Sequence, residues 1–98
     1  MLKKKFFKTN EDCEVTFEFT APEATEVVLL CDAANWEPAA MKKTKEGSFR
    51  TKMRLAKGGQ YQFRYLVDSQ TWVNDEAADA YWANEHGTDN SVVYTLQS

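Results

Sequence analysis

Hydrophobic and polar residues alternate most regularly along residues 61–67. Aromatic and branched side chains occupy every second position, and other residues stand between them: Tyr61, Phe63, Tyr65 and Val67 against Gln62, Arg64 and Leu66. Successive side chains of a strand point to opposite faces, so the pattern predicts a strand with Arg64 on its outer face. Residues 68–70 predict a turn, and Trp72 begins the returning strand. A cation and a large flat ring on one exposed surface are typical of a binding site.

The rest of the chain also divides into short strands. Alternation predicts strands over 13–20, 26–31 and 49–55, and a last strand over 91–96. Residues 74–82 resemble a helical turn in composition, but the strands that closely flank them favour an ordered loop. Short strands at regular spacing, without a long amphipathic helix, predict an all-β fold, an antiparallel β-sandwich.

The inward faces of these strands predict the core and the state of both cysteines. Six residues are expected to form the core shared by the sheets: Phe17, Phe19, Leu29, Phe63, Tyr65 and Val67. Cys13 and Cys31 share parity with inward residues, so we expect two buried thiols, although a disulfide is geometrically possible. Their spacing does not suit a metal, and His86 is the only histidine. We therefore expect no metal and no cofactor.

Composition limits the class of protein. The chain has 98 residues, 43% of them hydrophobic and 28% charged, which predicts one domain over residues 1–98. A net charge of −3 argues against a nucleic-acid partner. The basic run at residues 3–5 is not followed by an apolar segment long enough for a signal peptide or a membrane span. We expect residues 1–12 to be a solvated N-terminal arm and the chain to be cytoplasmic.

Four pieces of the chain, in order and at matching spacing, resemble a known family. They are VLLCDAANW at 28–36, LAKGGQYQFRYLVD at 55–68, Trp72 with Asp75, and GTDNSVV at 87–93. Together they resemble the family-48 carbohydrate-binding module, which is the isoamylase N-terminal early-set domain. They are also similar to the glycogen-binding domain of the AMP-activated protein kinase β-subunit. The resemblance implies an immunoglobulin-like β-sandwich that, in many relatives, holds α-1,4-linked glucan.

The resemblance also implies a set of sugar-contacting residues. In the glycogen-binding relatives two tryptophans, a basic residue, a threonine and an asparagine contact the sugar. Those positions are occupied here by Trp36, Trp72, Arg64, Thr88 and Asn90. The chemistry suits the role, because a glucose ring has apolar faces and a polar rim. Tryptophan rings supply flat faces, and arginine supplies a planar fork of donors.

Some positions depart from the family's pattern. Cys31 stands where glycine is common, and Ala33 stands where phenylalanine is common. These changes predict a reshaped loop around Trp36. Ser69 replaces the usual turn glycine, and Thr71 is an extra residue before Trp72. One inserted residue is expected to re-aim the Trp72 ring.

The singled-out residues also have structural alternatives. Trp36 and Trp72 could close the end of the sandwich rather than meet a sugar. Arg64 could form a surface ion pair with Asp68, Asp75 or Asp89. Thr88 and Asn90 stand where a turn would favour them in any case. Tyr81 and Trp82 lie outside the motif, and packing of the long loop is favoured over an extended binding surface.

Two functions from different classes follow. The first is a non-catalytic module that binds an α-glucan such as glycogen or a maltooligosaccharide. The alternative is a protein-interaction module with a decayed sugar site, associated with a glycogen-metabolising enzyme. We expect no enzymatic activity, because acidic loop residues are usually solvated and no motif places a nucleophile beside His86. Those carboxylates are Asp75, Glu76, Asp79 and Glu85.

Overall fold

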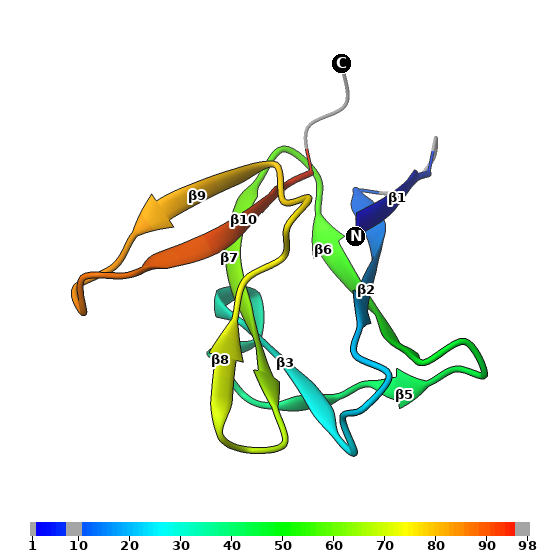
Figure 1. Ribbon diagram of the computed structural model, residues 1–98. Helices are drawn as coiled ribbons and strands as arrows, with labels where there is room; N and C mark the ends of the chain where they lie inside the picture. Colours follow the sequence, from blue (N-terminus) through cyan, green and yellow to red (C-terminus); the bar gives the residue numbers. More distant parts are fainter. Residues whose placement is uncertain (1, 8–10, 96–98) are drawn as a thin grey trace.

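Two antiparallel sheets face each other in the computed structural model, which describes residues 2–7 and 11–95 (Figure 1). Sheet A has the order β1 (Leu2–Phe6), β2 (Asp12–Thr20), β6 (Ser48–Ala56) and β5 (Lys42–Lys43). Sheet B has the order β4 (Ala39–Ala40), β3 (Val27–Cys31), β7 (Gln60–Val67), β10 (Asp89–Tyr94) and β9 (Ala80–Ala83), while β8 (Thr71–Val73) also pairs with β7. In the described part of the chain, the helical structure is one 3₁₀ turn, η1 (Asp32–Ala34). The predicted all-β antiparallel sandwich is confirmed.

The core lies between the sheets, where inward side chains of both meet. Phe17 of β2 and Phe63 of β7 pack edge to face, with ring centroids 5.0 Å apart. Leu29 and Tyr65 are likewise fully buried. Two of the six predicted core residues, Phe19 and Val67, are partly buried and pack at its margin. The alternation along β7 therefore assigned the two faces of the strand correctly.

Both cysteines are buried and free, as predicted. Cys13 lies on β2 of sheet A and Cys31 on β3 of sheet B. Burial raises the pKa of the Cys31 thiol to about 11 and also raises that of Cys13. Both side chains therefore behave as small hydrophobic residues.

The expected N-terminal arm is wrong for the part that the structure describes. Leu2–Phe6 forms strand β1, which pairs antiparallel with β2. Leu2 and Phe6 pack against the core, and the Lys4 ammonium lies 2.5 Å from a carboxylate oxygen of Asp79. Burial alternates along β1, but the sequence does not show it, because Lys4 faces the partner sheet although it is charged. Residues 1 and 8–10 of the expected arm lie outside the described residues.

The segment expected to be an ordered loop over 74–82 ends in a strand. Ala80–Ala83 forms β9, which pairs with β10 at the edge of sheet B. The Asp79 amide already donates to the Val92 carbonyl at 3.0 Å, so pairing begins before the strand. β10 starts at Asp89, two residues before the strand predicted over 91–96, and the predicted end at Leu96 lies outside the described residues.

Strand β7 has two partners on one of its edges. β3 pairs along one edge, whereas β10 and β8 follow each other along the other. The side chain of Asn74 joins these two, because its Nδ2 donates to the Asp89 carbonyl at 2.8 Å and its Oδ1 accepts from the backbone amide of Ser91 at 3.1 Å. This junction holds β8 and β10 in line beside β7. Among the described residues, no helix has the length and apolar character that crossing a membrane requires.

Candidate functional site

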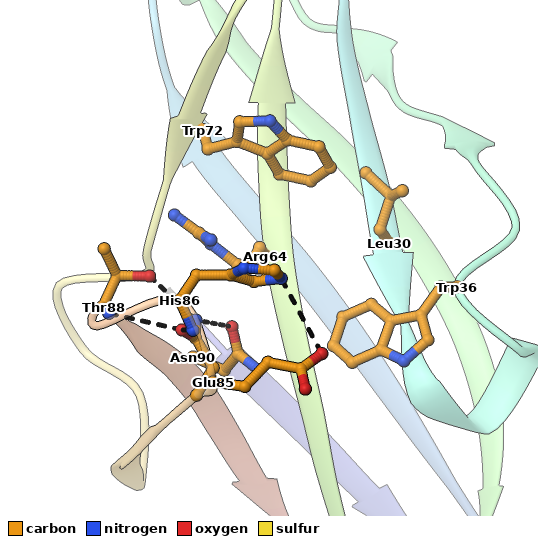
Figure 2. Close-up of a pocket in the computed structure, with 9 residues that line it drawn as sticks. Leu30, Trp36, Arg64, Trp72, Glu85, His86, Thr88 and Asn90 are labelled. Carbon is orange, nitrogen blue, oxygen red and sulfur yellow. Dashed lines mark hydrogen bonds and ion pairs between the residues drawn. The ribbon is translucent and has the colours of Figure 1, made fainter.

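A pocket of about 650 Å³ opens on the outer face of sheet B. Its lining includes all five residues that the sequence predicted for the site: Trp36, Arg64, Trp72, Thr88 and Asn90 (Figure 2). They come from the loop after β3, from β7, from β8, from the loop between β9 and β10, and from the start of β10. The tertiary structure thus brings together residues that span more than half of the chain.

Trp72 reaches the pocket because the β7–β8 turn accommodates the extra residue. Residues 68–70 connect the paired positions Val67 and Thr71, and the Gln70 amide donates to the Val67 carbonyl at 3.0 Å. Asp68 and Ser69 both have positive φ, 51° and 59°. This geometry is that of the tight hairpin turns that match strand twist. The insertion therefore does not remove Trp72 from the site.

The Arg64 side chain lies against Trp72, and no acid in the described part of the chain pairs with it. Its Cζ is 5.4 Å from the centroid of the Trp72 ring, within cation–π range. Among the described residues Arg64 makes no ion pair, so the alternative pairing with Asp68, Asp75 or Asp89 is not present. Its Nε is buried and has no hydrogen-bond acceptor in that part of the chain. Such an atom carries a desolvation penalty.

Trp36 approaches from the other side of the pocket, on the loop that follows η1. Its amide donates to the Cys31 carbonyl at 2.9 Å, and Asp32 accepts from the Gln62 amide at 3.1 Å, which ties the loop to β7. Asn35 and Trp36 have φ values of 55° and 61°. This left-handed conformation is costly for a bulky residue and persists where surrounding contacts hold it. Trp36 is 38% exposed and lies outside the core cluster.

Asn84 organises the hairpin that carries Thr88 and Asn90. Its side-chain Nδ2 donates to Thr88 Oγ1 at 2.8 Å and to Asn90 Oδ1 at 3.1 Å. Its side-chain Oδ1 accepts from the backbone amide of His86 at 2.9 Å. Asn90 is 8% exposed and also donates to Gln62 Oε1 at 3.0 Å. Asn90 therefore lines the pocket and at the same time fixes the hairpin to β7, whereas Thr88 is exposed.

Four lining residues were not among the predicted ones: Leu30, Asn84, Glu85 and His86. Leu30 pairs with Arg64 across β3 and β7, and its parity in the strand was the available signal. The other three belong to the hairpin tip, where alternation ends and local sequence gives no direction. His86 Nε2 lies 3.8 Å from Glu85 Oε1, and both side chains are largely exposed. In Figure 2, the Glu85 side chain extends from the hairpin toward Trp36.

Two exposed tryptophan rings, a rim of polar groups and a β-sandwich scaffold define a carbohydrate-binding module. Residues 13–98 match the family model described as the glycogen recognition site of AMP-activated protein kinase. The chain belongs to this family. The resemblance to the glycogen-binding domain of the kinase is confirmed, whereas the family-48 and isoamylase assignments stay predictions. The comparison with curated proteins gave no match.

Solved structures show the same fold in larger proteins. Enterobactin esterase from Shigella flexneri superposes with a TM-score of 0.77 at 11% identity, covering 95% of this chain and 32% of that one. Ferric enterobactin esterase from Salmonella typhimurium gives a TM-score of 0.76 at 11% identity, covering 99% of this chain and 35% of that one. This chain therefore spans about a third of each esterase. At this identity the similarity concerns the fold alone.

Proposed function

We propose that the protein is a non-catalytic module that binds α-glucan, either glycogen or maltooligosaccharide, in the pocket on sheet B. The observation that carries the proposal is the convergence on one pocket of two exposed tryptophans and an arginine that forms no ion pair with the described residues. Trp36 is 38% exposed and Trp72 48% exposed, so both rings offer a face to a ligand. Membership of a glycogen-recognition family supports the choice of an α-linked glucose polymer.

Each group in the pocket matches part of a glucose unit. The indole faces suit the C–H faces of the sugar ring, and the water they release supplies most of the attraction. The Arg64 guanidinium offers several donors in one plane to neighbouring hydroxyls. The Thr88 hydroxyl can both donate and accept at the rim. Because the site is shallow and wet, we expect a dissociation constant between micromolar and millimolar, about −8 to −4 kcal/mol.

The proposal excludes a catalytic role for this pocket. Glycoside hydrolysis needs a pair of carboxyl groups across the scissile bond. Among the described residues that line the pocket, Glu85 supplies the one carboxylate, and its side chain is 88% exposed. Asp75, which the sequence offered as another acid, is buried and accepts a hydrogen bond from the Tyr65 hydroxyl at 2.7 Å. Its environment supports a structural role.

We further propose that the module acts in the cytoplasm, without nucleic acid or membrane as a partner. The net charge of −3 supports the absence of a nucleic-acid partner, because nucleic acid is itself negatively charged. A protein partner from glycogen metabolism would bring the module to its polymer. The alternative function, a protein-interaction module without sugar binding, predicts the opposite result in the experiment below.

Affinity electrophoresis through a gel that contains glycogen tests the proposal. We expect the wild-type chain to be retarded relative to a gel without glycogen. Trp36→Ala and Trp72→Ala should each abolish the retardation, because each removes one face of the site. Both should leave the melting temperature nearly unchanged, because neither ring belongs to the core. Trp72→Phe, which keeps a ring, should retain part of the retardation.

Two results would overturn the proposal. If the wild-type chain binds neither glycogen nor maltoheptaose at millimolar concentration, the pocket is not an α-glucan site and the interaction module is favoured. If the alanine variants unfold, the two rings are structural instead. Titration of maltoheptaose by calorimetry provides the second measurement in each case.

A further inference from the structure

One row of side chains crosses the outer face of sheet B from one side to the other. Leu30 of β3 lies opposite Arg64 of β7. Ser91 lies opposite Phe63, so the next residue, Asn90 of β10, lies opposite Arg64. These three residues all line the pocket. The row continues for one more strand beyond them.

Trp82 of β9 is the fourth member of this row. It lies opposite Asn90 across the β9–β10 pair. Side chains directly opposite each other in an antiparallel pair lie on the same face. The register with Asn90 thus places Trp82 on the face that carries the pocket, with 36% of the residue exposed.

Its neighbour Tyr81 has the opposite orientation and a structural contact. Tyr81 lies opposite Ser91. The Tyr81 hydroxyl donates a hydrogen bond to the Asp75 carbonyl, which fastens the long loop to the edge strand. The expectation that these residues pack the long loop is therefore confirmed for Tyr81, and for Trp82 it stays a prediction. Trp82 faces the other way, and this fastening does not account for it.

We propose that Trp82 is an additional aromatic subsite for the same α-glucan, used by long chains and not by short ones. This inference rests on the proposed function of the pocket. β3 and β9 are three strand spacings apart, about 14 Å between backbones. A short oligosaccharide can fill the pocket between Trp36, Arg64 and Trp72. A longer chain that leaves the pocket past Asn90 would meet the Trp82 ring at the sheet edge.

Isothermal titration with two linear ligands, maltotriose and maltodecaose, tests the subsite. We expect Trp82→Ala to weaken maltodecaose binding about threefold to tenfold, the range of one aromatic stacking contact. Maltotriose binding should change less than twofold. Trp82→Phe, which keeps a ring, should recover most of the maltodecaose affinity. Tyr81→Phe on the opposite face of the same strand is the matched control and should bind both ligands as the wild type does.

A second measurement uses the protein without substitution at Trp82. The chain has three tryptophans, so labelling with 5-fluorotryptophan gives three fluorine resonances. Single Trp→Phe variants assign them. We expect the Trp82 resonance to shift with maltodecaose and to stay in place with maltotriose, while the Trp72 resonance shifts with both. This measurement decides the question even if Trp82→Ala fails to fold.

The outcomes separate the subsite from the proposed function. If the wild type binds both ligands and Trp82→Ala binds them unchanged, or its resonance does not move, Trp82 is no subsite and the pocket keeps its function. If Trp82→Ala weakens both ligands equally, the residue acts by holding the hairpin, which also overturns the subsite. If the wild type binds neither ligand, the proposed function fails and the subsite fails with it.

Discussion

The guanidinium carbon of Arg64 lies 5.4 Å from the centroid of the Trp72 ring. The relationship is set by strand register: Trp72 lies opposite Leu66, two residues beyond Arg64 on the same face of β7. Diagonal neighbours of this kind are within reach of aromatic and long side chains. The ring orients the guanidinium through a cation–π contact. A cation held in this way is prepared for a neutral polar ligand.

Replacing Arg64 by methionine should weaken maltoheptaose binding about tenfold, because hydrogen bonds from a charged donor are lost. The free energy of unfolding should stay the same or rise by up to about 1 kcal/mol, since a buried nitrogen without an acceptor is removed. Calorimetric titration and denaturant melts measure the two effects. Arg54→Met is the control: Arg54 lies on sheet A, with Cζ 4.6 Å from the Phe7 ring, and its loss should not affect binding. If Arg64→Met binds maltoheptaose as tightly as the wild type does, Arg64 does not contribute to the site.

Ser69→Gly should stabilise the fold by about 0.5–1 kcal/mol. Ser69 has a φ of 59°, a conformation that costs a residue with a Cβ roughly 1–2 kcal/mol and costs glycine little. The greater entropy of glycine in the unfolded chain offsets part of the gain. Binding should be unchanged, because the register that places Trp72 is kept.

The same substitution in a strand provides the control for Ser69. Ser48 is the first residue of β6, and its φ is not positive. Ser48→Gly should therefore destabilise the protein, by about 0.5–1 kcal/mol. Thermal melts of both variants measure the effect. Destabilisation by Ser69→Gly would mean that the serine side chain itself supports the turn.

Phe63→Ala should cost about 3–5 kcal/mol of unfolding free energy, because the ring is fully buried between the sheets. A domain of this size has a total stability of about 5–15 kcal/mol, so the variant should be close to unfolding at moderate temperature. Leu66→Ala, on the partly exposed outer face of the same strand, should cost less than half as much. A loss below about 1 kcal/mol in denaturant melts of Phe63→Ala would contradict the assigned faces.

Tyr65→Phe should cost about 1.5–3 kcal/mol, because it removes a buried hydrogen bond of 2.7 Å to the Asp75 carboxylate. Burial, and next the charge of Asp75, raise the pKa of Tyr65 well above its usual value of 10.0. The folded state therefore favours the neutral phenol. Its contribution is complete below pH 10 and is lost as the pH rises above it, by about 1.4 kcal/mol per pH unit.

The variant isolates that pH dependence from other titrating groups. The difference in unfolding free energy between wild type and Tyr65→Phe should be constant between pH 7 and pH 9 and should shrink above pH 10. Denaturant melts across this range measure it. A difference that stays constant to pH 11 would mean that Tyr65 ionises freely in the folded protein.

The sequence predicts features that depend on neighbouring residues better than features that depend on contacts between distant segments. Alternation is a property of the extended backbone itself, so it correctly placed Phe63 and Tyr65 inside and Arg64 outside. The same alternation missed β1, because Lys4 points toward the other sheet and finds its partner 75 residues away in Asp79. The sequence around Lys4 does not predict such a distant partner.

The candidate site divides in the same way. Sequence motifs indicated the residue types of Trp36, Arg64 and Trp72, and local geometry made each of them outward-facing. Their convergence, and the position of Trp82 beside Asn90, follow from strand pairing between distant segments. β8 and β10 follow each other along one edge of β7, and β9 adds itself to β10. The sequence by itself determined which side chains leave the core. The tertiary structure decided which of them meet, because local periodicity does not predict which distant strands pair through hydrogen bonds.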